Sequence, residues 1–185
     1  MTAARIARGV LVAATVFYCA GTLGQPKSDW EIKLEEREWK EGEIKLPAYP
    51  KPENLIEFEM LGTGTFRYFI DAESLVAGED GAVRYTLLAR SASGVENVSF
   101  NGVRCKTSAH KLYATGRSDK TWVEARNSDW KDLGAKTAAR VHVLLMRDFF
   151  CPAGVPIMSR AEGVDALRNG IHPNAVSNQP GLGQR

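Results

Sequence analysis

The chain has 185 residues, of which 44% are hydrophobic and 25% charged, with 24 lysines and arginines against 22 aspartates and glutamates. This length suits one globular domain and is too short for two well-filled cores. A formal net charge of +2 gives little support to a partner chosen by its negative charge.

The first 24 residues have the order of parts found in a cleavable export signal. Arg5 and Arg8 stand before an apolar run over residues 9–23, and a charged stretch begins at once at Lys27. The run is shorter than the roughly 20 apolar residues that a membrane-spanning helix needs. We therefore expect cleavage after Gly24 and a periplasmic protein that does not span the membrane.

Two alternatives to a cleaved signal fit the sequence less well. Cys19 lies late in the apolar run, where a cysteine can become the lipidated first residue of an outer-membrane lipoprotein. Lipoprotein processing requires a small residue before the cysteine, whereas Phe17 and Tyr18 are bulky, so the cleaved signal is favoured. A hydrophobic first helix of a cytoplasmic protein is also less favoured, because no polar face interrupts the run.

Cleavage leaves two cysteines, Cys105 and Cys151, and an even number in an oxidising compartment predicts a disulfide between them. Metal ligation is disfavoured, because His110 and His142 lie five and nine residues away from them and no close CxxC or HxxxH pair exists. Loss of the two signal arginines leaves 22 bases and 22 acids, so neither nucleic acid nor an anionic membrane is expected as a partner.

Residues 25–54 are expected to be extended and partly helical. Ser28 and Glu31 have the spacing of a capping box, which predicts a short helix through Lys40 that ends at Gly42. Three prolines between positions 47 and 52 predict an extended connector. Residues 25–60 carry ten acids against six bases while the remainder is basic by four, so we expect the two parts to attract each other.

From position 55 onward the hydrophobic period changes to two. The strongest strand covers residues 83–90, where Val83, Tyr85 and Leu87 share one face and the opposite face begins with Arg84. This alternation predicts a sheet with one buried face and one partly solvated face. Turn signals, including the Gly81 hairpin signal, separate further expected strands over residues 55–59, 66–70, 95–104, 111–116 and 121–125.

The last third of the chain is less regular. Residues 141–150 fit either a strand or a helix, and a period count leaves both open. Ser159 and Glu162 form a capping box that predicts a short helix ending at Gly170. The residues from 171 to 185 are rich in Pro, Asn, Gln and Gly and are expected to be disordered.

These elements predict an α+β domain over residues 55–170. Its parts are an antiparallel meander of five or six strands, a short C-terminal helix and one disulfide.

Several short sequences along the mature chain form a specific series when taken together. They are Leu46-Pro47, Phe69-Ile70-Asp71 with Ser74-Leu75, Gly81 with Val83-Arg84-Tyr85, Gly102-Val103-Arg104-Cys105, Lys111-Leu112-Tyr113-Ala114, Trp122, Trp130 and Asp148-Phe149-Phe150-Cys151-Pro152. With this series, the chain from about Trp30 to Cys151 resembles the CNP-one-like family of uncharacterised exported proteins of Gram-negative bacteria. The resemblance implies export and a shared β-rich fold. It carries over no catalytic residues, because none is established for the family.

The cysteines also have a layout similar to that of surface-adhesin E type envelope proteins, in which a strand-borne cysteine is bonded to one near a C-terminal helix. Here Cys105 follows a predicted strand and Cys151 precedes the predicted helix. The similarity concerns layout alone and serves as an analogy for a binding role.

No motif predicts a catalytic centre, a metal or a cofactor. Residues 62–65 begin like a phosphate-binding loop, but Arg67 stands where the third glycine belongs and a strand follows instead of a helix. There is no GxSxG sequence, and His142 is interpreted as a packing residue rather than a base. A serine, histidine and aspartate set assembled from distant positions stays open.

Arginines and aromatic residues on the predicted strands are the one candidate binding face. Such residues are typical of sites for anionic sugars, peptides or proteins, although a solvated sheet face over an aromatic core is the favoured alternative. We hypothesise a non-enzymatic envelope module that binds an envelope protein, peptide or glycan, with a periplasmic hydrolase as the alternative. The candidate residues are Arg67, Arg84, Arg90, Arg104 and Tyr113.

Overall fold

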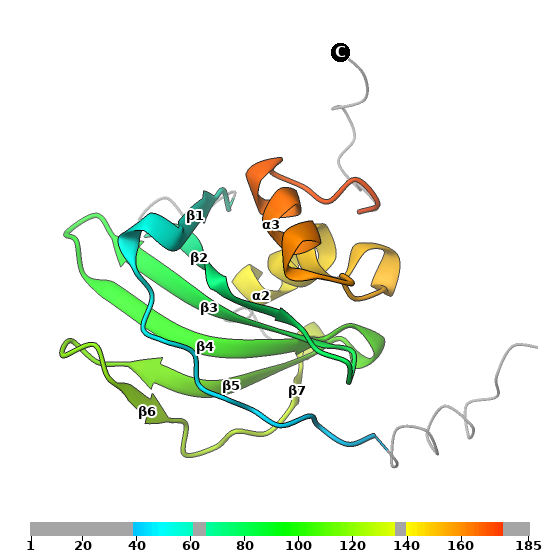
Figure 1. Ribbon diagram of the computed structural model, residues 1–185, viewed down its shortest axis with the longest axis horizontal. Helices are drawn as coiled ribbons and strands as arrows, with labels where there is room; N and C mark the ends of the chain where they lie inside the picture. The colour runs from blue at the N-terminus through cyan, green and yellow to red at the C-terminus, as the bar shows by residue number, and fades with distance from the viewer. Residues whose placement is uncertain (1–38, 61–65, 136–139, 176–185) are drawn as a thin grey trace, which may run out of the picture. The chain divides into compact units, whose positions relative to one another are not determined.

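Six strands follow one another as an antiparallel meander, each paired with the next along the chain (Figure 1). The computed structural model describes residues 39–60, 66–135 and 140–175, and residues from Lys40 onward belong to one compact unit. A seventh strand pairs with β5 beside the meander. The strands are β1 (Leu55–Phe58), β2 (Phe66–Ala77), β3 (Ala82–Ser91), β4 (Glu96–Arg104), β5 (Ala109–Gly116), β6 (Trp122–Glu124) and β7 (Lys131–Asp132).

The predicted meander and the α+β class are confirmed, and two differences have clear causes. β7 was not predicted, because two residues are too few to show an alternating pattern. β2 continues to Ala77, well beyond the predicted residues 66–70. The prediction ended too early because the register of β2 shifts between Asp71 and Val76. Such an irregularity inserts extra residues into one strand and hides the period of two.

A serine side chain repairs the backbone hydrogen bonding at this irregularity. Asp71 faces Thr86 and Val76 faces Arg84, so the residues between them have no regular partners. The buried Ser74 hydroxyl donates to the Asp71 carbonyl at 2.8 Å and accepts the Thr86 N–H at 2.9 Å. It therefore replaces the missing ladder bonds in a place that water does not reach.

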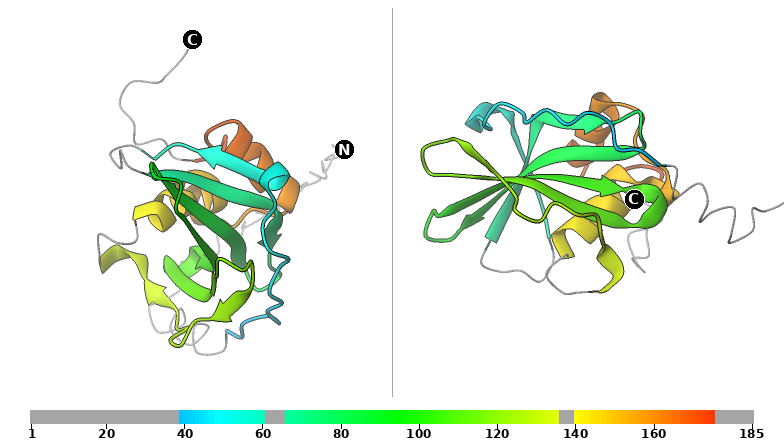
Figure 2. Two further views of the ribbon diagram at one scale, coloured as in Figure 1. Left: turned by 90° about the vertical axis from the view of Figure 1, so that its left-hand side faces the viewer. Right: turned by 90° about the horizontal axis from the view of Figure 1, so that it is seen from below.

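The segment left open between helix and strand is helical. The α-helix α2 (Arg140–Leu144) continues as a π-helix over Leu145–Phe150, and α3 (Arg160–Arg168) follows. The helices cover one face of the sheet (Figure 2). Buried side chains from both layers form the main core, including Ile70, Val83 and Tyr85 from the sheet and Leu145 and Phe150 from the π-helix.

The capping box at the start of α3 is confirmed. The Ser159 hydroxyl oxygen accepts the Glu162 N–H at 3.2 Å. The Glu162 carboxylate completes the cap by accepting the N–H of Met158 at 2.7 Å, one residue earlier than the capping-box pattern requires. Gly170 follows the helix with a φ of 78°, the left-handed conformation that glycine adopts freely.

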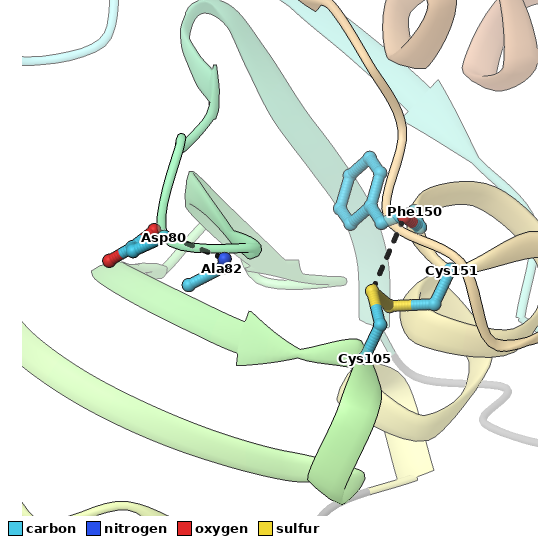
Figure 3. The surroundings of a disulfide bond; sticks show 5 residues. All are labelled: Asp80, Ala82, Cys105, Phe150 and Cys151. Atoms are coloured by element: carbon cyan, nitrogen blue, oxygen red, sulfur yellow. Dashed lines mark hydrogen bonds between the residues drawn. A yellow bond between two sulfur atoms is a disulfide. The ribbon is translucent and has the colours of Figure 1, made fainter. Parts of the chain in front are cut away.

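The predicted disulfide between Cys105 and Cys151 is present, with Cα atoms 5.4 Å apart (Figure 3). Cys105 directly follows β4, and Cys151 directly follows the π-helix. Both residues are buried. The bond therefore fastens the helical layer to the sheet.

Residues 40–51 contain neither helix nor strand and run along the sheet on the side away from α2 and α3 (Figure 1). We call this segment the strap. The extended connector predicted from its prolines is confirmed up to Lys51. The predicted helix end at Lys40–Gly42 is wrong, and residues 28–38 of that helix lie outside the described residues.

The C-terminal boundary of the packed domain also needs correction. The backbone N–H of the buried His172 donates to the Asp148 carbonyl at 2.8 Å, and the ring atom Nε2 of His172 lies 3.0 Å from a Glu162 carboxylate oxygen. Ordered structure therefore extends at least to Ala175, beyond the expected end at 170. The expected signal, residues 62–65 and residues 176–185 fall outside the described part.

Among the described residues, no helix is both long and apolar enough to cross a membrane.

Candidate binding face on the sheet

The candidate face is the side of the sheet opposite α2 and α3, which we call the outer face. Its apolar base is made by two small clusters of buried residues that the strap side chains Ile44 and Tyr49 help to cover. The residues of this base are Phe69, Leu88, Val98, Phe100, Tyr113 and Ala114.

Two of the predicted residues, Arg84 and Tyr113, meet on this face although a strand lies between them. Arg84 Nε donates to the Tyr113 hydroxyl at 3.2 Å. Gly102 of β4 pairs with Arg84 on one side and Lys111 on the other. A Cβ atom at Gly102 would lie 2.9 Å from the Tyr113 ring and hydroxyl, so only glycine leaves room for Tyr113 to lie across β4.

Asp80 in the hairpin before β3 binds the Arg84 guanidinium through both carboxylate oxygens, one of them at 3.0 Å. The same carboxylate accepts the N–H groups of Gly42 at 2.8 Å and Ala82 at 3.1 Å. Burial alone would raise the pKa of Asp80, but these hydrogen bonds outweigh it and lower the pKa to about 2. Each nitrogen of the Arg84 guanidinium therefore has a hydrogen-bond partner inside the fold.

The strap brings a second carboxylate, Glu41, to the same place. It accepts hydrogen bonds at 2.6 Å from both the Tyr113 hydroxyl and the Lys111 ammonium group. Lys111 Nζ also lies 5.1 Å from the Tyr113 ring centre and 5.9 Å from that of Trp130. Burial, followed by the hydrogen bond to Glu41, raises the pKa of Tyr113, so its hydroxyl stays protonated and donates.

Further along, the strap is anchored by two aromatic residues. Trp122 Nε1 donates to the Pro47 carbonyl at 2.9 Å. The Tyr49 ring lies 5.4 Å from that of Trp122, and its hydroxyl donates to the Arg117 carbonyl at 3.1 Å. The Tyr49 ring also lies over Gly116, where a Cβ would approach it to 2.8 Å.

Arg67 and Arg90 face each other on β2 and β3 at the opposite end of the face, close to the Phe69 ring. Their guanidinium carbons lie 5.4 and 4.8 Å from the ring centre. Arg67 forms an ion pair with Glu57 and Arg90 with Glu96. Their side chains keep 63% and 33% of their surface exposed, so this end is open to solvent.

The sequence predicted that four arginines lie on a partly solvated face, namely Arg67, Arg84, Arg90 and Arg104. This prediction is wrong for Arg84 and Arg104. Arg84 and Arg104 are buried, with 6% and 7% of their surface exposed. Asp80 and the strap cover Arg84, while Arg104 lies at the end of β4 beside the disulfide. Sequence reasoning did not identify Asp80 and Glu41 as partners, although the acidic N-terminal segment and the basic remainder pointed to contacts of this kind.

A separate polar cluster lies under α2, on the other side of the sheet. The Tyr85 hydroxyl is 2.8 Å from His142 Nδ1, and the His142 ring stacks on that of His110 at 3.8 Å. The Asn101 amide nitrogen donates to Ser99, so its oxygen accepts a hydrogen bond from His110 Nε2 at 3.1 Å. His142 thus has the contacts expected of a packing residue.

Both stacked histidines are neutral at pH 7. Burial, with a smaller effect of Lys131, lowers the pKa of His110 to about 4. Burial, with a smaller effect of His110, lowers the pKa of His142 to about 3. Across residues 39–60, 66–135 and 140–175, no three His, Cys, Asp or Glu side chains come together as a metal site.

A shallow hollow of about 610 Å³ lies between β2 and α3. Arg160 in its lining donates to the Leu75 carbonyl and pairs with Glu73, both at 3.2 Å. The hollow is lined by Ala72, Glu73, Arg160, Ala161, Val164 and Arg168.

Comparison with known proteins identifies the family of this chain. The model of the CNP1-like family matches residues 34–168. The chain belongs to this family. It is also similar to cryptic neisserial protein 1 of Neisseria gonorrhoeae, with 28% identity over 65% of this chain and 67% of that protein. No solved structure matches.

The resemblance drawn from short motifs is thereby confirmed, and the family match extends beyond Cys151 through α3. The motifs that carried the resemblance also supply much of the outer face. These residues are Arg84, Gly102, Lys111, Tyr113, Trp122 and Trp130.

Proposed function

We propose that this CNP1-like protein is an exported, non-enzymatic binding module of the cell envelope. The observation that carries the proposal is the pairing of cations with aromatic rings at both ends of the outer face. Arg67 and Arg90 lie over Phe69, and Lys111 lies over Tyr113. Cations that are held over aromatic rings are the usual parts of sites for anionic groups and polypeptide segments.

The contacts of the histidines support binding rather than catalysis. A general base needs a reacting hydroxyl, thiol or water within hydrogen-bond reach. In the described part of the chain, His142 contacts the Tyr85 hydroxyl, His110 contacts Asn101, and His172 contacts Glu162. All three partners are side chains of the fold itself, and the Tyr85 hydroxyl and the Asn101 amide are buried where a substrate does not reach them.

Export is supported by the signal-like residues 1–24 and by the disulfide, since such bonds persist in oxidising compartments. Mass spectrometry of the protein from its native host should find a first residue at Gln25. An acylated Cys19 at the N-terminus would show a lipid anchor instead, and an intact Met1 would contradict export.

Binding is tested by affinity capture from envelope extract with the tagged mature protein. Arg67→Ala and Arg90→Ala should keep the wild-type melting temperature, because both side chains are solvated, and should recover at least about tenfold less partner. Arg126→Ala removes an exposed arginine elsewhere and should recover the wild-type amount. Equal recovery by all three variants, or no specific partner, would contradict the proposal.

A further inference from the structure

We infer that the strap is an exchangeable occupant of the outer face. The surface that it covers around Lys111, Tyr113 and Trp122, which we call the seat, would bind an extended peptide segment of another protein that carries a glutamate or aspartate at the position of Glu41. The segment would place a carboxylate on Lys111 and Tyr113 and, further along, a proline and an aromatic side chain against Trp122. This inference rests on the proposed binding function and names the partner's chemistry.

The first support is the contrast in burial between the strap and what it covers. Every residue from 40 to 51 is exposed or half-buried. The side chains beneath it are buried, including Arg84, Phe100 and Tyr113. Segments with little buried surface open at a lower free-energy cost than the core to which they are attached. The strap can therefore leave without unfolding the sheet.

The second support is the way in which the strap is held. It forms no ladder with any strand and is anchored at Glu41, at the Gly42 N–H, at the Pro47 carbonyl and at Tyr49. At roughly 3.3 Å per residue, the eight residue steps from Glu41 to Tyr49 span about 26 Å when fully extended. These contacts form the pattern by which a folded domain holds an extended peptide, with a few side-chain anchors and no continuous pairing.

The third support is charge complementarity at the seat. Lys111 and Tyr113 both donate to the Glu41 carboxylate, and the Arg84 guanidinium, whose hydrogen bonds go to Asp80 and Tyr113, lies 3.9 Å from the same carboxylate. An incoming segment without a carboxylate would leave both donors without their partner, which costs binding free energy. The seat therefore selects a segment that has a carboxylate at this position. A competing cis strap also lowers the apparent affinity for any such segment.

The test uses the full mature chain and a fluorescent peptide that copies residues 40–51. Glu41→Gln weakens the strap in cis by removing its charged anchor, so the peptide should bind this variant at least about tenfold more tightly than wild type. Glu43→Gln is the matched control, because Glu43 is 80% exposed and its ion pair is with Lys45 of the strap itself. It should leave the affinity unchanged in fluorescence anisotropy.

Two further measurements complete the test. A peptide with glutamine in place of its first glutamate should lose most of its affinity for Glu41→Gln protein. Adding Lys111→Gln to that protein should abolish binding of the unmodified peptide, with circular dichroism showing that the chain is folded.

The inference is wrong if the peptide binds wild type, Glu41→Gln and Glu43→Gln equally, or binds none of them. It is also wrong if Glu41→Gln protein forms dimers by light scattering and ignores the peptide, because the seat would then belong to a second copy. Capture through Arg67 and Arg90 does not involve the strap, so the proposed function can stand when this inference fails.

Discussion

Ser74 shows how one side chain sustains an irregular strand. Replacing it with alanine removes the hydroxyl that bonds both the Asp71 carbonyl and the Thr86 N–H. Unpaired buried backbone groups cost about 1–3 kcal/mol, so Ser74→Ala should lower the free energy of unfolding by that amount in guanidinium titrations. Ser93→Ala alters an exposed turn and should stay within about 0.5 kcal/mol of wild type. Equal values for the two variants would show that Ser74 does not sustain the ladder.

Arg84 is a scaffold residue by its contacts, and its replacement tests that assignment. Arg84→Ala leaves the Asp80 carboxylate buried without its cation, a change that typically costs about 3–5 kcal/mol. Because the pKa of Asp80 is lowered to about 2, its stabilising effect is present above pH 4 and is lost as the pH falls toward 2. Arg84→Ala should flatten this acid limb in unfolding titrations between pH 5 and 2. A melting temperature equal to wild type would place Arg84 on a functional surface instead.

Among the secondary-structure elements, those that were predicted correctly carry their own local signals. The alternation over residues 83–90 and the Ser159 capping box specify β3 and the start of α3 without reference to the rest of the chain. The exposure of Arg84 was predicted wrongly because an alternating pattern tells which residues share a face and not which segment covers it. The strap that covers it has no period of its own, and its partners lie about 70 residues away.

The contact between α2 and the sheet predicts a dependence on pH. Protonation of His110 and His142 is disfavoured in the folded state, whose pKa values are about 4 and about 3. Their contribution to stability is therefore present above pH 6.5 and declines as the pH falls toward 4. His142→Phe keeps a stacked ring that cannot titrate. Its free energy of unfolding should be lower at pH 7, since Tyr85 loses a partner, but should fall less between pH 6.5 and 4. An unchanged slope would contradict this role of the histidine pair.

At the scale of the whole domain, the helices cover one side of the sheet and the strap covers part of the other, and the two are held by different means. The helices are joined to it by the main apolar core and by the disulfide, whereas the strap is held by a few polar and aromatic anchors. The two sides of the sheet therefore differ in how firmly they are covered. The cysteine count of the sequence predicted the disulfide. The difference in how firmly the two sides of the sheet are covered depends on contacts that only the folded chain shows.

The disulfide is a covalent constraint on how the helices lie against the sheet. It joins residues 46 positions apart, and closing a loop of that length stabilises a fold by about 4 kcal/mol in the chain-entropy model. Cys105→Ser, Cys151→Ser and the double variant should each lower the free energy of unfolding by about 2–5 kcal/mol in guanidinium titrations. The double variant should lose no more than either single one, because one bond is removed in all three. Wild type under a thiol reductant should show the same loss, while the reductant should leave the double variant unchanged. Two freely labelled thiols in protein prepared from its native compartment would show that the bond does not form there.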